Sequence, residues 1–463
     1  MLSARIFLFF LAILSGSLAT KHSFWRGRVA DDFHGNTSHL SKPLPSEKWF
    51  VQQSDPYYML DNKTFHQRYY VNTEFFKSKT GPVFLFIGRE GPVSSRWMVE
   101  GAWLRYAQEL GALCLQIEHR FYGRSYPTGT TINEDCPLLS SEIALTDIAL
   151  FIREMQTELD LTPKSRWIVF GGGYGGSLAA WLRVKFPHLV HGAVSSSAPL
   201  LGRADFSEYY NAVENAIVDC RSAVQEAFRG IEKELETSIG RKLVSEQFKL
   251  SVVQYNGNPY FKHSIKEVCN IMNDNSRGTP FNRLAALNKI FLKDDGLSCM
   301  DYKYDKMINE LKEMNWEEDS NVNGTLHWMM QLCKEFGWFP TINNASHIFG
   351  NYFPIDFFLT QCSDAFRQLF NQFSLEKSIS NNNVIYGGIG IKATNTIYVY
   401  GDLDPWRRIG LSETKTEGFR SILIHGTAHC ADMYEPRNDD PSELKEARQQ
   451  IQNYIAEILN QTE

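Results

Sequence analysis

A glycine-rich segment, Gly171–Gly176, separates a β-like apolar run from a helical one. A strand–turn–helix with glycines on both sides of its middle residue is typical of a nucleophile elbow, where a strained turn exposes a serine at its apex. Gly171 and Gly175 match the flanking glycines, but the apex is Gly173. The segment therefore has the backbone pattern of a nucleophile site without the hydroxyl that the chemistry needs.

Two later segments could supply an acid and a base for the same chemistry. Asp402 and Asp404 follow the apolar run 396–400, and His429 follows the next run, 421–425. An acid after one late strand and a histidine after the next is the chain order of α/β-hydrolases, in which the carboxylate fixes the tautomer of the histidine. An Asp-rich turn alone is usually only a turn, so the prediction rests on all three segments together.

The glycine segment has a second interpretation, as a phosphate-binding loop, because glycines before a helix N-terminus suit phosphate groups. A dinucleotide fingerprint belongs near the first strand and is followed about 20 residues later by an acid, whereas His191 stands there in this chain. We therefore favour the elbow. Its oxyanion hole would combine the N–H of Tyr174 with that of a residue in the loop after the run 82–87, for which Gly91 is the candidate.

The apolar runs predict the elements that would position these residues. Expected strands cover 82–87, 112–118, 166–170, 191–195, 396–400 and 421–425, and expected helices cover 138–158, 178–185 and 441–459. Strands that alternate with helices are typical of βαβ units and a parallel sheet. We predict an α/β fold whose core, residues 20–205 and 386–463, is interrupted by a mostly helical cap at 206–385.

The N-terminus has the pattern of a secretory signal peptide. Arg5 precedes the apolar run 6–14, and Ser17 and Ala19 are the small residues expected before a cut after Ala19. The run is too short to span a bilayer. Removal of residues 1–19 would leave a chain without a membrane anchor, in the secreted or endolysosomal lumen. Five sequons fit that route: Asn36, Asn62, Asn323, Asn344 and Asn460.

The cysteines and the composition narrow the class of protein. None of the eight cysteines forms a CxxC pair, which argues against zinc or thioredoxin-like chemistry. An oxidising compartment predicts disulfides, while Cys114 lies in an apolar run and is a candidate buried free thiol. The 463 residues, 43 % of them hydrophobic, are typical of a globular protein, and the net charge of −6 gives no basic field for nucleic acid. We expect no metal and no organic cofactor.

Further short motifs stand in order along nearly the whole mature chain. They are Gln67–Tyr69 with Val71–Asn72, Glu90–Gly91, Glu118–Gly123, Gly171–Trp181, Lys185–His188, Ser196–Pro199, Gly401–Trp406 and His429–Met433. Together they resemble the prolylcarboxypeptidase family of serine peptidases. The resemblance implies an α/β-hydrolase domain with a helical cap, and hydrolysis of peptide bonds next to proline or a small residue near a chain end.

The resemblance also implies roles for single residues. The family's catalytic acid maps to Asp404 and not to Asp402, its catalytic histidine maps to His429, and its nucleophilic serine maps to Gly173. A peptide is then the expected substrate or ligand, and a homodimer is compatible with what some relatives form. Without an Oγ at position 173 no acyl-enzyme can form, so we predict a peptidase-fold protein with impaired catalysis.

Several alternatives stay open. The chain could be an active serine-type peptidase that uses Ser177, one of the serines at 195–197, or water, or one in which the glycine at 173 is a sequence error. It could also be an esterase or lipase on the same fold. The segment Glu118–Arg120 is interpreted as a buried structural network at a strand end in preference to a metal or acid–base site.

Overall fold

The computed structural model describes residues 40, 42–58, 62–127, 137–235, 263–294, 304–313, 324–342, 347–350, 354–366, 370–412 and 420–461. The predicted signal peptide lies outside these residues. So do Asn36, Asn323 and Asn344 among the sequons, and Cys136 and Cys299 among the cysteines.

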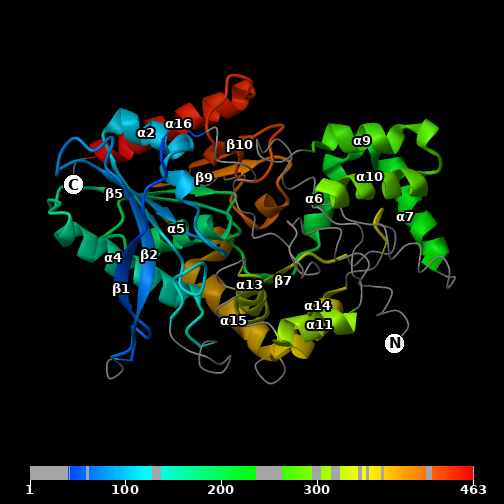
Figure 1. Ribbon diagram of the computed structural model, residues 1–463, viewed down its shortest axis with the longest axis horizontal. Helices are drawn as coiled ribbons and strands as arrows, with labels where there is room; N and C mark the ends of the chain where they lie inside the picture. The colour runs from blue at the N-terminus through cyan, green and yellow to red at the C-terminus, as the bar shows by residue number, and fades with distance from the viewer. Residues whose placement is uncertain are drawn as a thin grey trace.

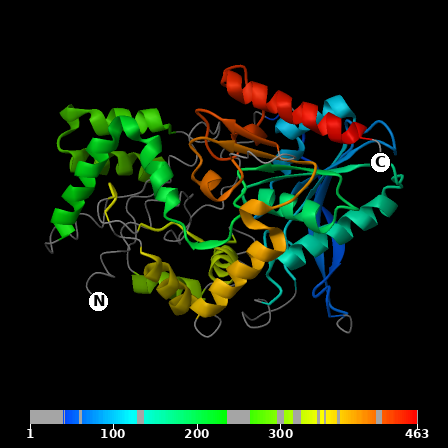
Figure 2. The ribbon, with the colours of Figure 1, turned by 180° about the vertical axis from the view of Figure 1, so that it is seen from behind.

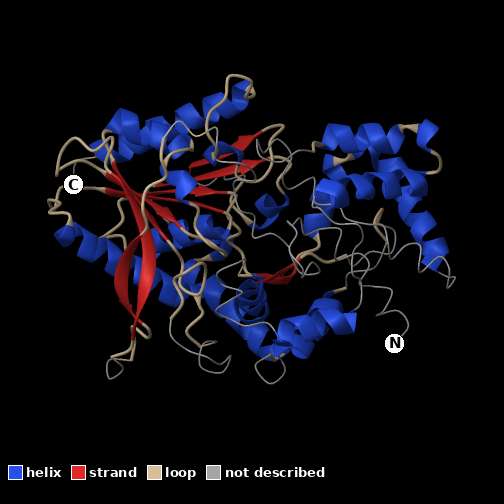
Figure 3. Cartoon of the chain, in the orientation of Figure 1, coloured by secondary structure: helices blue, strands red, loops and turns tan. Residues whose placement is uncertain are grey.

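An eight-stranded sheet forms the centre of the fold (Figures 1 and 3). Its strands, in spatial order, are β1 (Lys48–Gln53), β2 (Thr64–Asn72), β4 (Leu113–Ile117), β3 (Val83–Ile87), β5 (Trp167–Gly172), β6 (Gly192–Ser196), β9 (Thr396–Gly401) and β10 (Arg420–Ile424). β2 runs antiparallel to both β1 and β4, and the remaining neighbours are parallel. This arrangement confirms the predicted α/β-hydrolase fold.

Helices cover both faces of the sheet (Figures 1 and 2). α2 (Ala102–Leu110) and α16 (Ser442–Asn460) pack on one face, and α4 (Ser141–Glu158) and α5 (Tyr174–Lys185) on the other. Every residue of β3, β4 and β5 is therefore buried. A strand covered on both faces is apolar along most of its length, which is why these runs could be recognised in the sequence.

A long insertion separates β6 from β9. Its short strands β7 (Arg203–Asp205) and β8 (Gly337–Phe339) form a separate parallel pair. The helices that the structure describes in it are α6 (Glu208–Ala216), η3 (Val218–Cys220), α7 (Arg221–Leu235), α9 (Ile265–Asn273), η4 (Asn275–Arg277), α10 (Pro280–Asp294), α11 (Tyr304–Glu313), α13 (Thr325–Gln331), η5 (Leu332–Phe336), α14 (Ile355–Phe366), α15 (Gln372–Tyr386) and η7 (Gly388–Gly390). Figure 1 shows these helices to one side of and below the large sheet.

Two disulfides cross-link this insertion. Cys220 is bonded to Cys269, and Cys333 to Cys362. Cys114 is a free buried thiol, as its apolar surroundings predict, and Cys430 is a second one. Among the described residues no helix is long and apolar enough to cross a membrane.

The end of β4 is tied to α4 by a buried ion pair. The Nε and Nη2 atoms of Arg120 donate to the two carboxylate oxygens of Asp147 at 2.6 and 2.7 Å. Both side chains are almost completely excluded from solvent. This pairing agrees with the structural interpretation of the segment that contains Arg120.

We predict that Asp147→Ala destabilises the fold by about 3–5 kcal/mol, because the substitution leaves a buried guanidinium without its countercharge. Glu154→Ala in the same helix is the matched control. Its carboxylate pairs with Arg153 on the surface, so its loss should cost about 1 kcal/mol or less. Urea unfolding of the two variants measures the difference, and equal destabilisation would contradict the assigned role of Asp147.

Candidate active site

The turn between β5 and α5 has the geometry of a nucleophile elbow. Gly173 separates the two elements with φ of 56° and ψ of −126°. Its N–H donates to the carbonyl oxygen of Ser196 in β6 at 3.0 Å. A positive φ costs glycine little and other residues more. The turn therefore places residue 173 at an apex beyond the carboxyl end of β5, as the sequence predicts.

The neighbouring glycines are required by close packing. A Cβ on Gly171 would lie 2.1 Å from the carbonyl oxygen of Gly175, and one on Gly176 would lie 2.8 Å from that of Ser196. A Cβ on Gly173 would meet nothing nearer than Nε2 of His429, at 3.2 Å. Of these three glycines, Gly173 alone has space for a side chain, which would point to the imidazole.

Asp404 and His429 come together from the ends of β9 and β10. Nδ1 of His429 lies 3.2 Å from each carboxylate oxygen of Asp404. Asp404 is fully buried and also caps the short helix η8 (Pro405–Ile409) by accepting from the N–H of Trp406 at 3.1 Å. One carboxylate thus starts a helix and orients the imidazole.

Asp402 has a different position. Its carboxylate accepts from the N–H of Gly426 at 2.8 Å and lies 3.2 Å from Nδ1 of the exposed His425. It holds the turn after β10 and does not reach His429. The two aspartates therefore have different partners, and the role of Asp404 as the catalytic acid stays a prediction.

His429 lies in an environment that favours its charged form. Burial lowers its pKa, but the sulfur of Cys430 and the carboxylate of Asp404 raise it by more, so that the pKa is well above its usual value. The imidazole is nine-tenths buried. Its Nδ1 faces Asp404, and its Nε2 faces the apex at Gly173.

The two candidate oxyanion donors, Tyr174 and Gly91, come from different elements. Tyr174 is the first residue of α5, and N–H groups in the first helical turn have no acceptor within the helix. Gly91, with φ of 122°, lies in the loop after β3. Gly91 and His429 line the same cleft. Their positions are compatible with the predicted roles.

A buried carboxylate holds the loop that carries Gly91. Glu118 accepts from the N–H of Val93 at 3.1 Å and from the N–H of Arg124 at 2.9 Å. It also accepts from Oγ of Ser125 at 2.6 Å and forms an ion pair with Arg68. Glu118 therefore belongs to a buried structural network, which is how the segment Glu118–Arg120 was interpreted from the sequence.

The side chain of Tyr174 links the core to the insertion. Its hydroxyl lies 3.1 Å from Nε2 of His119 and accepts from Nε2 of Gln331 at 3.2 Å. Its ring packs against Trp328 and Phe336. Burial lowers the pKa of His119 to about 3, so that this histidine is neutral and acts as a hydrogen-bonding partner.

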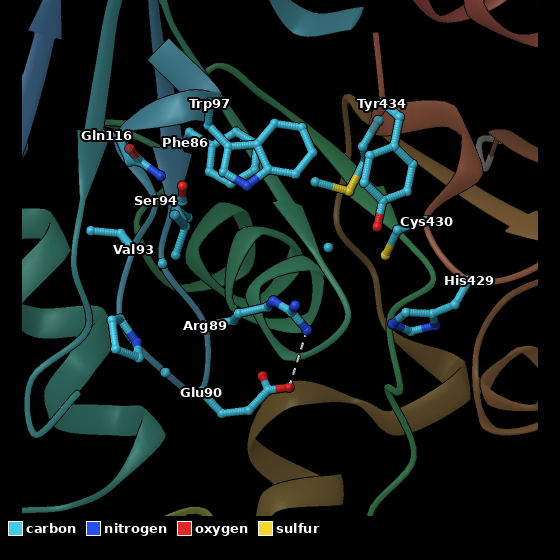
Figure 4. A pocket seen from close by; sticks show the side chains of 16 residues that line it. Phe86, Arg89, Glu90, Val93, Ser94, Trp97, Gln116, His429, Cys430 and Tyr434 are labelled. Carbon is cyan, nitrogen blue, oxygen red and sulfur yellow. Dashed lines mark hydrogen bonds and ion pairs between the residues drawn. The ribbon is translucent and has the colours of Figure 1, made fainter. Parts of the chain in front are cut away.

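A cleft opens between the loop 88–94 and the segment that follows β10. Figure 4 shows His429, Cys430 and Tyr434 on one side and Arg89 and Glu90 on the other. The cleft is open to solvent. Phe86, Trp97 and Met433 add an apolar wall. The cleft thus combines an apolar wall with the ion pair between Arg89 and Glu90, whose Nη1 and Oε1 atoms are 3.3 Å apart.

The serines considered as substitutes for the nucleophile have other partners. Ser177 donates to the carbonyl oxygen of Pro199 at 2.6 Å, and Ser195 donates to that of Gly176 at 2.9 Å. Ser196 donates to Asp432 at 2.5 Å, and Ser197 accepts from the N–H of Cys430 at 2.8 Å. None of these four serines lines the cleft.

Two residues of the cleft escaped the sequence reasoning. Arg89 brings a guanidinium into the space (Figure 4). Cys430 directly follows His429, and that adjacency was the signal available for it. Among the described residues, no group of three His, Cys, Asp or Glu side chains is placed to hold a metal ion.

The strand order and the elbow after β5 place the chain in the α/β-hydrolase class. The chain belongs to the family described as serine carboxypeptidase S28, which matches residues 52–252 and 250–451. It is 31 % identical to thymus-specific serine protease of Mus musculus, over 90 % of this chain and 88 % of the relative, and 30 % identical to the Homo sapiens protein, over 88 % and 85 %. Lysosomal Pro-X carboxypeptidase of Mus musculus is 27 % identical, over 89 % of each chain.

We predict that Asp404→Asn lowers the pKa of His429, because it removes the negative charge beside Nδ1. A raised pKa in the folded state stabilises the fold at pH values below the unfolded value of 6.5, and this stabilisation is lost as the pH rises through the folded value. NMR titration of the ring protons measures the change, with Asp402→Asn as the control that should leave His429 unaltered. An unchanged pKa in the Asp404 variant would rule out the coupling.

Asp432 generates a second pH prediction. Burial raises its pKa from 3.8 to about 6, although Ser196 and Arg448 oppose the shift. The unfolded state then loses its proton at a lower pH than the folded state, so Asp432 makes the fold less stable as the pH rises from about 4 to 6. Asp432→Asn should remove this loss. The free energy of unfolding of the variant, relative to that of the native chain, should therefore rise by roughly 3 kcal/mol between pH 4 and pH 7. Urea unfolding of both proteins at the two pH values tests this prediction. A difference in free energy of unfolding between variant and native chain that stays the same at both pH values would contradict it.

Proposed function

We propose that this protein binds peptides near a chain end in the cleft and hydrolyses them far more slowly than family members that have the serine. The observation that carries the proposal is Gly173 at the apex of an otherwise complete elbow. Its missing side chain is the nucleophile that a serine peptidase needs to form an acyl-enzyme. Membership of a serine peptidase family supports a peptide as the ligand.

The remaining site supports binding and polarisation of a carbonyl group. The proposed roles of Asp404 and His429 as acid and base are supported by two distances. Nδ1 of His429 lies 3.2 Å from the carboxylate, and its Nε2 lies 3.2 Å from the position of a Cβ on residue 173. The N–H groups of Tyr174 and Gly91 are proposed as oxyanion donors. Water that gives its proton to the neutral form of His429 could attack a bound peptide. The raised pKa of His429 makes that form scarce, and no covalent intermediate can form, so the reaction would be slow.

We further propose a lumenal location, secreted or endolysosomal. Two disulfides fit an oxidising compartment, and a relative of 27 % identity is named a lysosomal enzyme. Asn62 and Asn460 are exposed, as glycosylation requires. We also propose that residues 1–19 are removed as a signal peptide and that residues 206–385 form a helical cap. A homodimer is the proposed oligomeric state.

Gly173→Ser tests the proposal directly. We expect purified native protein to leave short proline-containing peptides uncleaved and the G173S variant to cleave them. The gain could reach about a million-fold, because loss of the nucleophile in subtilisin costs roughly 2 × 10⁶ in rate. A fluorophosphonate probe should label the G173S variant and not the native chain.

Gly173→Ala is the matched control, because it adds the same Cβ in the same strained conformation, at a cost of roughly 1–3 kcal/mol, without a hydroxyl. It should remain inactive. Native hydrolysis within tenfold of the G173S rate would mean that the nucleophile lies elsewhere and would overturn the proposal.

A further inference from the structure

The second free thiol of the described chain lies beside the elbow. A Cβ on Gly172 would stand 2.9 Å from Sγ of Cys430, while a Cβ on Gly173 would stand 3.2 Å from Nε2 of His429. A sulfur and an imidazole nitrogen thus face two consecutive residues of one turn. Figure 4 shows both groups on the same wall of the cleft.

The backbone fixes this thiol in place. Cys430 has φ of 56°, in the left-handed region, and its N–H donates to Oγ of Ser197 at 2.8 Å. Its sulfur lies 3.9 Å from the carbonyl oxygen of Ser196, a long contact for a weak donor. The thiol is therefore held weakly by the backbone, and its side-chain hydrogen bond is with the imidazole of His429.

The two free thiols of the core differ in access. Cys114 is fully buried in β4, and burial raises its pKa, so it is inert toward reagents in water. Cys430 is 8 % exposed and lines the cleft. Of the two free thiols among the described residues, Cys430 is the one that combines access with a neighbouring base, which is the environment of reactive cysteines.

We propose that Cys430 is a reactive thiol of this cleft, which forms a mixed disulfide with a peptide or small molecule that carries a disulfide, with His429 as its base. A disulfide is the electrophile that the surroundings favour, because Cys220–Cys269 and Cys333–Cys362 require a compartment in which disulfides persist. The proposal goes beyond peptide binding and does not depend on residue 173.

The chemistry is thiol–disulfide exchange. His429 accepts the thiol proton at Nε2, and the Cys430 thiolate attacks one sulfur of the bound disulfide. The new S–S bond forms as the old one breaks, and the departing thiolate takes the proton back from His429. One disulfide is consumed and one is formed, so no external oxidant is needed.

Several charged and titratable groups surround the pair and bear on its pH dependence. They are Asp404 after β9, Tyr400 within β9, Asp432 in η9 (Ala431–Met433), and Arg89 and Glu90 after β3. Asp404 favours the imidazolium that would pair with a thiolate, as in other Cys–His sites.

Labelling of the intact protein tests the proposal. The native chain is incubated with hydroxyethyl disulfide, or with iodoacetamide, and adducts are counted by intact mass and located by peptide mapping. We expect an adduct at Cys430 that Cys430→Ser abolishes, and no adduct at Cys114. Cys114→Ser is the matched control and should leave labelling at Cys430 unchanged.

The pH profile separates an activated thiol from an ordinary one. A thiol with a pKa near 8.5 loses more than about 100-fold in thiolate between pH 8.5 and pH 6. We expect the iodoacetamide rate at Cys430 to fall less than tenfold over that range. In His429→Asn it should follow the ordinary profile, at least about tenfold slower than the native chain at pH 6.

Absence of an adduct at Cys430, or a native profile that matches a lone thiol, would overturn the proposal. The pH profile of the iodoacetamide rate can be measured on the native chain alone. It therefore tests the proposal even where His429→Asn fails to fold. Labelling requires no peptide hydrolysis, which separates this test from that of the proposed function. A native protein that cleaves peptides would overturn the latter and leave Cys430 labelling as expected.

Discussion

The close crossing of the backbone at the elbow constrains the rest of the site. Gly171 lies against the carbonyl of Gly175, so α5 can begin directly above the end of β5. The left-handed turn at Gly173 then aims one Cα at the imidazole of His429. A side chain in place of Gly171 would push α5 away and would separate the apex from the histidine.

The electrostatics of the site are independent of the missing hydroxyl. Asp404 sets the orientation of His429 from the end of β9, and Glu118 holds the opposite loop from the end of β4. Both carboxylates are fully buried and hydrogen-bonded. Each also stabilises backbone, through the cap of η8 or the N–H of Val93. These structural duties give both carboxylates a reason to be retained that does not depend on a side chain at position 173.

The sequence predicted the elements that are uniform in composition and missed those that are not. The strands β3, β5 and β9 are unbroken apolar runs, because both of their faces are covered. β2 could not be recognised in the same way, because its buried side chains include polar ones such as Gln67, whose amide is paired with Gln52 and with the carbonyl of Glu118. β1 is an edge strand with mostly exposed residues. The position of the Cys430 thiol depends on a left-handed residue that no composition rule indicates.

The distribution of sulfur divides the described chain in two. Both disulfides cross-link the insertion, closing loops of 49 and 29 residues. Each raises the free energy of the unfolded chain by about 4 kcal/mol, because it restricts the conformations of that chain. Both free thiols belong to the sheet domain, which is held by its apolar core. A reducing environment would therefore loosen the helical half and leave the sheet intact. An oxidising environment would secure the helices. If Cys430 exchanges as proposed, the surrounding redox potential then governs the stability of one half and the chemistry of the other.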